Sequence, residues 1–404
     1  MATRLLKQVP EKLDSVMALQ KQFLAQNKSD ALMNLIIGAY RDRSGKPYVF
    51  ESVKEAKRIL QSTVQTHEYE QITGNPKFLD QSRILYGLNT QDGFDNVQSL
   101  SGTGALKLAA DFLKQTFFGH TIGTKPVIYV PNPTWDNHHN IFETSGLHVD
   151  IYDYLTNGRF DTDTLIENID RIPNDSIIVL HACAHNPTGY DLEEYQYAKI
   201  VKICQSKNLF PLVDMAYLGF ASGTFYKDLA LVRKLNDSKL PCLIATSYAK
   251  NFGLYSARCG NLFFRGYSPE ENENMKSILR YIIRTSYSSP PAEGSNIITT
   301  ILSDPKLNTM WQHELTSIVD HYKYIRRNLR ERLENEINKD FSSITEQVGM
   351  FWYSGEKITS KENMFMRSKG IYFLDNGRIS LAGLNDLNID RFTKILADAK
   401  QSVQ

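Results

Sequence analysis

The segment at residues 246–260, TSYAKNFGLYSARCG, brings an amine, a hydroxyl and a guanidinium together in a short stretch of chain. Ser247 precedes Lys250 with an S-x-x-K spacing, and Arg258 follows further along. A lysine amine can form a Schiff base with an aldehyde, while hydroxyl and guanidinium groups bind phosphate. The segment therefore indicates a site for a phosphorylated aldehyde cofactor.

The segment LSGTGALKLAADFL, at residues 100–113, predicts a turn of small residues that runs into an amphipathic helix. The backbone N–H groups of Gly102, Thr103 and Gly104 would form an anion site at the helix start, where the helix dipole also favours negative charge. Many such turns are only helix caps, and for this turn by itself both interpretations stay open. Together with Ser247 and Arg258 it becomes a third source of phosphate ligands.

Asp214 directly follows an apolar run in NLFPLVDMAYLGF, at residues 208–220. A carboxylate in this position either caps a helix or lines a functional cleft, and the spacing favours neither. A pyridoxal ring would account for it, because an ionised carboxylate keeps the pyridine nitrogen protonated and lets the ring withdraw electrons. Tyr217 could then hydrogen-bond the phenolate oxygen of that ring.

The segment HACAHNPTGYD, at residues 181–191, carries His181 and His185 four residues apart, which superficially suggests a metal pair. A strand that leads into an Asn-Pro-Thr-Gly turn would not align the two rings as a helix does, and no third ligand lies near them in the sequence. We therefore predict no metal site here. The turn instead fixes Asn186, whose amide could donate a hydrogen bond to the ring oxygen.

The segment PNPTWDNHHN, at residues 131–140, displays Trp135 and His138 after a predicted strand. Trp135 is either a buried structural side chain or an indole stacked on a planar cofactor. The sequence leaves both interpretations open.

Two arginines remain, Arg284 in IIRTSYSSPP and Arg378 in NGRISLAGL. Each taken singly is typical of a surface residue. Beside a cofactor site they become bidentate clamps for carboxylates. Two clamps imply a substrate with two carboxylates.

The composition of the chain narrows the class of protein. Its 404 residues are 42% hydrophobic and 23% charged, and its net charge of +1 favours neither nucleic acid nor an anionic membrane as a partner. No apolar run approaches the roughly 20 residues of a membrane span, and residues 1–16 lack the apolar core of a signal peptide. The four cysteines lie far apart, which argues against a disulfide framework and fits a reducing compartment. We expect a soluble, cytoplasmic protein.

Short apolar runs alternate with segments of helical periodicity, which predicts an α/β fold whose mostly parallel sheet is covered on both faces. The runs are VIYV (127–130), IIVL (177–180), FPLV (210–213), CLIA (242–245) and NLFF (261–264). The candidate site residues follow these runs, at the carboxyl edge of the sheet, where open α/β folds bind ligands. A long helix is predicted from about residue 304 to 335. We expect a large domain at 46–315 and a smaller one built from 1–45 and 316–404.

The order of these motifs over nearly the whole chain resembles the class I aminotransferases, in their aspartate aminotransferase branch. The matching motifs are IIGAYRD (36–42), HEY (67–69), SGTGA, NPTW, HNPTG, DMAY, SYAKNFGLY, YSSPP and GRISLAGL. The resemblance implies a fold type I transferase, with a seven-stranded sheet between helices in its large domain and a smaller α/β domain from both termini. It also implies a homodimer with shared active sites, which exchanges amino groups between dicarboxylic amino and keto acids through pyridoxal 5'-phosphate.

The resemblance further implies a role for each matching residue. Lys250 carries the cofactor and exchanges the α-proton, Asp214 pairs with the ring nitrogen, and His138 supports Asp214. The other ring contacts are assigned to Tyr217, Asn186 and Trp135. The phosphate ligands are Ser101, Gly102, Thr103, Ser247, Arg258 and, from the neighbouring subunit, Tyr69. The substrate contacts are Arg378 for the α-carboxylate, Gly38 beside it, Trp135 and Asn186, and Arg284 of the neighbouring subunit for the distal carboxylate.

The chain departs from the family at a few positions. Ser256 and Ala257 stand where the family usually has Asn-Glu, Ile36 where it often has glycine, and Leu218 where it often has glutamine. These departures remove no reacting group and bear on the substrate range. An aromatic or broad-specificity aminotransferase on the same scaffold is the nearest alternative to aspartate aminotransferase. Pyridoxal-dependent decarboxylation or elimination, and a binding protein without activity, are more distant alternatives.

Overall fold

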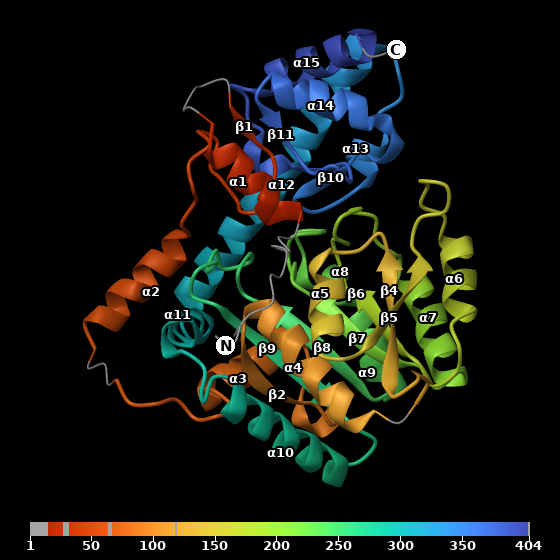
Figure 1. The fold of residues 1–404 in the computed structure, drawn as a ribbon. Coiled ribbons are helices and arrows are strands. Elements are labelled where there is room, and N and C mark those ends of the chain that lie inside the picture. The colour runs from red at the N-terminus through yellow and green to blue at the C-terminus, as the bar shows by residue number, and fades with distance from the viewer. Residues whose placement is uncertain (1–14, 27–31, 64–66, 118, 403–404) are drawn as a thin grey trace, which may run out of the picture.

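The computed structural model describes residues 15–26, 32–63, 67–117 and 119–402 (Figure 1). A larger part contains the main sheet and the helices around it, and a smaller part contains segments from both ends of the described chain. In Figure 1 the smaller part, in red and blue, lies above the larger one.

The main sheet has seven long strands, and it is mostly parallel as predicted. In spatial order they are β2 (Asp95–Leu100), β9 (Cys259–Arg265), β8 (Cys242–Ser247), β7 (Phe210–Met215), β6 (Ile177–His181), β4 (Lys125–Asn132) and β5 (His148–Asp153). Of these seven strands, β9 alone runs in the opposite direction to the other six. The two-residue strand β3 (Thr121–Ile122) adds an eighth strand as a hairpin with β4. All five apolar runs singled out in the sequence lie in these strands.

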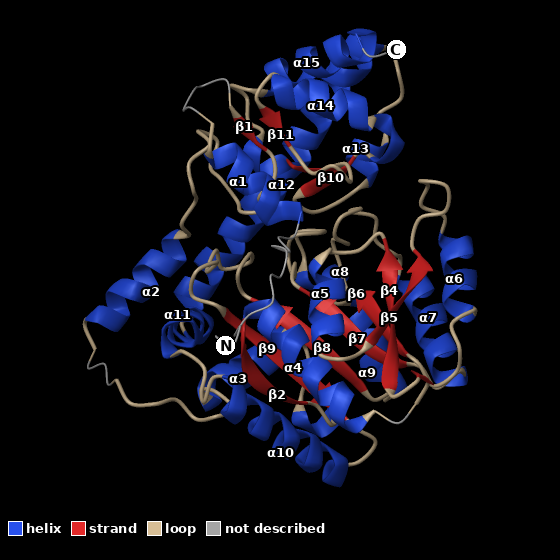
Figure 2. Ribbon diagram, in the orientation of Figure 1, coloured by secondary structure: helices blue, strands red, loops and turns tan. Residues whose placement is uncertain are grey.

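Side chains alternate between two cores on the two faces of the sheet. Leu212 and Leu243 belong to one core, whereas Val213 and Ile244 belong to the other. The first core includes residues of α4 (Ser101–Thr116), α5 (Asn137–Thr144) and α10 (Pro269–Ser286). The second includes residues of α6 (Thr162–Asp170), α7 (Glu194–Ser206) and α9 (Ala230–Ser238). Strands covered on both faces need apolar residues on both, which is why their sequences read as continuous apolar runs. Figure 2 shows the red strands between blue helices.

The long helix predicted from about residue 304 to 335 is confirmed as α12 (Pro305–Ile337). Asp304 caps it by accepting the N–H groups of Lys306 and Leu307, and proline stands at its first position, where no hydrogen-bond donor is needed. Asn338 ends it in a left-handed conformation. The helix extends from the sheet region into the smaller part (Figure 1).

The smaller part joins segments that are far apart in the sequence. β1 (Met33–Asn34) pairs in parallel with β11 (Ile371–Tyr372), and β10 (Phe351–Tyr353) pairs antiparallel with β12 (Arg378–Ser380). Helices α13 (Ser343–Glu346), α14 (Ser360–Ser368) and α15 (Ile389–Ser402) complete it. The domain boundaries at 45/46 and 315/316 stay a prediction, and residues 1–14 of the N-terminal segment lie outside the described residues.

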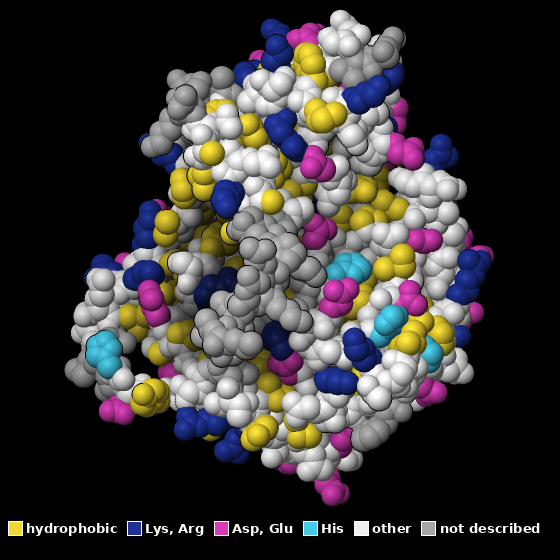
Figure 3. Space-filling view, in the orientation of Figure 1, with side chains coloured by type: hydrophobic (Ala, Val, Ile, Leu, Met, Phe, Trp, Pro, Cys, Tyr) yellow, Lys and Arg dark blue, Asp and Glu magenta, His cyan; other side chains and the backbone are white. Residues whose placement is uncertain are grey.

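The remaining helices connect or cover these two parts. They are α1 (Ser15–Leu24), α2 (Glu51–Gln61), α3 (Pro76–Leu85), α8 (Phe225–Asp228), α11 (Ala292–Ser303) and three short 3-10 helices, Thr90–Asp92, Gly355–Lys357 and Leu381–Gly383. The four cysteines are buried and free. Within the described ranges, no helix combines the length and the apolar character needed to cross a membrane. Basic and acidic side chains are interspersed on the face drawn in Figure 3.

Candidate active site

Most of the predicted site residues meet at one cavity of about 290 Å³ at the carboxyl edge of the sheet. Those that line it are Gly38, Ser101, Gly102, Thr103, Trp135, Asn186, Asp214, Tyr217, Ser247, Lys250, Arg258 and Arg378. They come from segments up to 340 residues apart (378 minus 38), which the parallel strands and the smaller part of the fold bring together.

The start of α4 forms one end of the cavity and suits a phosphate. The helix begins at Ser101, and Leu100 before it has no side-chain acceptor to cap the first N–H groups. The hydroxyl oxygens of Ser101 and Ser247 lie 2.9 Å apart beside this helix start. A β-carbon on Gly102 would lie 3.2 Å from the β-carbon of Ser247, so a glycine keeps this approach open. Arg258, which is exposed where it lines the same cavity, adds a positive charge.

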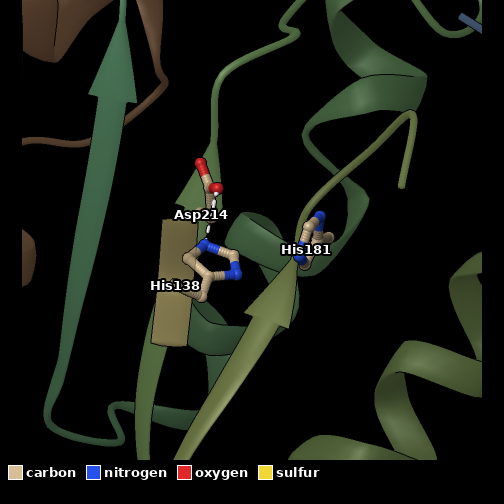
Figure 4. A group of neighbouring side chains, drawn as sticks. All are labelled: His138, His181 and Asp214. Carbon is tan, nitrogen blue, oxygen red and sulfur yellow. Dashed lines mark hydrogen bonds and ion pairs between the residues drawn. The ribbon is translucent and has the colours of Figure 1, made fainter. Parts of the chain in front are cut away.

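A chain of hydrogen bonds supports Asp214, and Figure 4 shows its last link, from His138 to the carboxylate. His138 Nε2 lies 3.1 Å from Asp214 Oδ2, and His138 Nδ1 lies 2.8 Å from Thr134 Oγ1. Thr134 Oγ1 also lies 3.3 Å from Nε2 of His181, whose Nδ1 accepts the backbone N–H of Asn186 at 3.4 Å. These partners assign the protons in one direction: His181 Nε2–H donates to Thr134, Thr134 donates to His138, and His138 Nε2–H donates to Asp214.

The hydrogen-bond chain sets the charge of Asp214. Burial by itself raises the pKa of Asp214, but the hydrogen bond that His138 donates, with a smaller contribution from the charge of Lys250, lowers it below its ordinary value. Burial lowers the pKa of His181 to about 3, so this ring is neutral. The ring nitrogens of His138 and His181 and the Asp214 carboxylate lie near enough to one another to hold a metal ion. Because these atoms already serve the hydrogen-bond chain, we interpret the group as the support of Asp214.

Lys250 lines the same cavity as a weakly basic amine. Burial, with smaller contributions from Arg258 and Arg378, lowers the pKa of Lys250 to about 8, although Asp214 acts in the opposite direction. Its Nζ lies 4.7 Å from the centroid of the Tyr217 ring. An amine with this pKa can be neutral, and therefore nucleophilic and basic, near neutral pH.

Arg378 and Asn186 lie together at the end of the cavity that faces the smaller part. Arg378 is buried, and it donates to Asn186 Oδ1 at 3.3 Å and to the carbonyl of Ile36 at 2.9 Å. The amide nitrogen of Asn186 in turn lies 3.5 Å from the hydroxyl of Tyr217. A buried guanidinium beside an amide can bind a carboxylate that enters the cavity.

Two predicted residues do not reach the cavity of their own chain. Tyr69 is 89% exposed, and Arg284, near the end of α10, is also exposed. Both were expected to act from a neighbouring subunit, and that role stays a prediction.

The sequence reasoning missed several residues that contact the site, and four of them carry polar or aromatic groups. Tyr255 and Phe351 line the cavity, and Thr134 and His181 form the chain beneath Asp214. Thr134 and His181 lie within motifs that were singled out. If His181 had been interpreted as a neutral hydrogen-bonding side chain, the sequence could have suggested both residues as supports of the site. Phe351 lies outside the motifs singled out in the sequence, and no local signal marks its ring as a site residue.

Comparisons with known proteins agree with this geometry. Residues 30–396 match the family described as aminotransferase class I and II. The chain is 40% identical over 373 residues to a mitochondrial aspartate aminotransferase of Schizosaccharomyces pombe, with 90% of this chain and 84% of that protein covered. The aspartate aminotransferase from Saccharomyces cerevisiae cytoplasm has a similar structure, with a TM-score of 0.90 at 33% identity and 98% of both chains covered.

An aromatic-amino-acid aminotransferase from Burkholderia pseudomallei, solved covalently bound to pyridoxal phosphate, is equally similar in structure. Its TM-score is 0.91 at 32% identity, and 99% of each chain is covered. A family match over most of the chain and relatives above 30% identity lead to one conclusion. This chain belongs to the class I and II aminotransferases.

Proposed function

We propose that this chain acts as an aspartate aminotransferase, which transfers the amino group of L-aspartate to 2-oxoglutarate and yields oxaloacetate and L-glutamate. The observation that carries the proposal is the meeting of Lys250, Asp214 and Arg378 at one cavity. A reactive amine, a buried carboxylate and a buried guanidinium are groups that a ping-pong transfer through pyridoxal phosphate can use. The aspartate aminotransferases among its relatives support the choice of substrate.

The residues present fit pyridoxal phosphate. The α4 start, whose first N–H groups are not capped by a side chain, and the adjacent hydroxyls form an anion cradle in the same cavity as the Arg378 guanidinium. Pyridoxal phosphate, when bound, supplies a conjugated ring that withdraws electrons from the α-carbon of the amino acid. The residues that would hold the phosphate are Ser101, Gly102, Thr103, Ser247 and Arg258.

The remaining cavity residues would hold and polarise the ring. Asp214, kept ionised by His138, would hold a proton on the ring nitrogen. Tyr217 and Asn186 would donate hydrogen bonds to the ring oxygen. Trp135, which is partly exposed and lines the cavity, would stack on the ring face.

Lys250 would move the proton of the substrate. With a pKa of about 8 its amine could take the proton from the α-carbon as a general base and then, as a general acid, return it to the cofactor carbon. Arg378 would bind the α-carboxylate and so hold the α-carbon within reach of that amine. Gly38 lines the same end of the cavity and leaves backbone exposed to the substrate.

We also propose a homodimer with shared active sites. Tyr69 and Arg284 are exposed in the single chain and lie outside its own cavity. A second copy would contribute Tyr69 to the phosphate and Arg284 to the distal carboxylate of the substrate. This arrangement explains how a chain with one buried arginine clamp could select a dicarboxylate.

The test is a substrate comparison with the purified, cofactor-loaded protein. We expect kcat/KM with 2-oxoglutarate to be higher for aspartate than for tyrosine or phenylalanine, because two arginines would bind two carboxylates. The structural similarity to an aromatic-amino-acid aminotransferase makes tyrosine and phenylalanine the informative competitors. Turnover of these amino acids in preference to aspartate would replace this proposal by the aromatic alternative.

The cytoplasmic location stays a prediction. The relatives include both mitochondrial and cytoplasmic proteins, so similarity does not choose between the two compartments. Subcellular fractionation of the source cells, followed by detection of the chain, tests it.

A further inference from the structure

Arg326 is a buried arginine of α12 whose hydrogen bonds all go to one backbone segment. Its Nη1 donates to the carbonyl of Ile344 at 2.7 Å. Its Nη2 lies 3.0 Å from the carbonyl of Val348, 3.0 Å from that of Gly349 and 2.5 Å from that of Phe351. Burial lowers the pKa of Arg326 to about 9. Burying a guanidinium is costly, and here fixed backbone carbonyls compensate for the lost water.

The segment that Arg326 holds, residues 344–351, contacts the turn that carries Asn186. The backbone N–H of Val348 donates to the carbonyl of Gly189 at 2.7 Å. A β-carbon on Gly349 would lie 2.8 Å from the β-carbon of Ala184, so the two backbones approach closely. A shift of this segment would therefore move the turn beneath the site.

The same segment ends at Phe351, whose ring lies against the predicted carboxylate clamp. The guanidinium carbon of Arg378 lies 4.3 Å from the centroid of this ring. A β-carbon on Gly38 would lie 2.4 Å from Phe351 Cζ, so the ring also fills the space beside Gly38. The position of Phe351 thus fixes two sides of the pocket around Arg378.

We propose that Arg326 is a positioning residue for the carboxylate pocket formed by Arg378 and Asn186. It acts through the backbone of residues 344–351 and the ring of Phe351, and it does not touch the substrate. This inference rests on the proposed function, because it assigns the Arg378 pocket to a substrate carboxylate. Loss of Arg326 weakens the binding of a carboxylate ligand, and it does so whether or not a reaction follows.

The test compares Arg326→Met and Arg326→Lys with the cofactor-loaded wild type. The binding readout is the equilibrium dissociation constant of succinate, a dicarboxylate without an amino group, measured by calorimetry. We expect about a tenfold rise in this constant for Arg326→Met and a smaller rise of about threefold for Arg326→Lys, which keeps the charge but loses the fork. The KM for aspartate should rise in parallel, while kcat stays within about twofold. Arg327→Met, at the exposed neighbour on the same helix, is the matched control and should change neither value.

Phe351→Leu separates positioning from general damage to the fold. If Arg326 acts through the ring of Phe351, the double variant Arg326→Met/Phe351→Leu should bind succinate no more weakly than the poorer single variant, because the two changes break one linkage. If Arg326→Met fails to fold, the dissociation constant of succinate is compared instead among Arg326→Lys, Phe351→Leu and their double variant. An unchanged dissociation constant in both Arg326 variants would overturn the proposal, as would full additivity in the double variant. A wild type that neither binds succinate nor transfers amino groups would instead refute the proposed function.

Discussion

His138 Nε2 lies 3.1 Å from Asp214 Oδ2, and both side chains are buried, with Asp214 lining the cavity and His138 behind it. Thr134 and His181 orient the imidazole from the other side, so its Nε2 proton points at the carboxylate. The hydrogen bond keeps the pKa of Asp214 below its ordinary value although burial acts to raise it. This pair therefore decides whether the cavity offers a negative charge to a ring nitrogen.

Replacing His138 by phenylalanine should weaken that charge. His138 already stacks on Phe142, so a phenyl ring retains the packing while it removes the hydrogen bond. Without its hydrogen-bond donor the buried Asp214 should protonate at a higher pH. Once the pKa of Asp214 lies above neutral pH, kcat at neutral pH should fall about tenfold for each further unit by which that pKa is raised. The measurement is kcat against pH, in which the acid limb should move upward. His139→Phe, at the adjacent and less buried histidine, is the control, and an unmoved acid limb in His138→Phe would contradict the argument.

The amine of Lys250 should set the pH dependence of cofactor uptake. Its pKa is lowered from 10.5 to about 8, and only the neutral amine attacks an aldehyde. The rate at which the cofactor-free protein takes up pyridoxal phosphate should therefore rise with pH, with an apparent pKa of about 8, and then level off. Stopped-flow absorbance measures this rate. Pyridoxamine phosphate, which has no aldehyde, should not show the same rise, and an apparent pKa near 10.5 would contradict the buried position of the amine.

The two predicted arginine clamps should differ in the substrates that they affect. Arg284→Leu should lower kcat/KM for aspartate by about 100-fold, because a paired charge is lost, and it should leave the value for phenylalanine within a few-fold. Arg378→Leu should lower kcat/KM for both amino acids, since each has an α-carboxylate. Steady-state kinetics with both substrates separate the two roles. Equal losses for aspartate and phenylalanine in Arg284→Leu would exclude Arg284 as the clamp for the distal carboxylate.

A mixture of two variants that each have little or no activity towards aspartate tests whether the active sites are shared. In a hybrid dimer of Lys250→Ala and Arg284→Leu, a shared site would combine Lys250 of one subunit with Arg284 of the other, so one site per hybrid would be intact. Mixing the subunits under dissociating conditions should restore about a quarter of wild-type activity towards aspartate, because about half of the dimers are hybrids with one working site. The two proteins assayed separately and then added together without exchange are the control. No recovery after exchange would mean that Arg284 does not act across the interface.

The sequence predicted five of the strands in the main sheet, but it did not reveal strand β2. Strands β4, β6, β7, β8 and β9 read as apolar runs because helices cover both of their faces. Strand β2, DNVQSL, is equally buried but polar: Asn96 donates to the carbonyl of Leu79, and Gln98 donates to that of Pro291. The hydrogen bonds of these polar side chains are made to backbone groups far away in the sequence, so the segment lacks the apolar pattern that indicates a buried strand.

The candidate site shows the same limit. The sequence motifs predicted the site residues that have reactive groups, because an amine or a carboxylate that follows an apolar run can be recognised in the sequence. Phe351 and Tyr255 were missed because their value comes from packing between distant segments, such as the contact of Phe351 with Arg378 and Gly38. Only the closure of the smaller part onto the sheet edge defines these contacts.

The most direct test of the account is the absorbance of the purified, cofactor-loaded protein before and after each substrate is added singly. We predict that aspartate converts the pyridoxal band to that of the aminated cofactor, and that 2-oxoglutarate then restores it. Lys250→Ala should hold the cofactor but fail to complete this cycle at a comparable rate. A wild-type band that ignores aspartate, or a Lys250→Ala protein that cycles at a near-normal rate, would contradict the central claim.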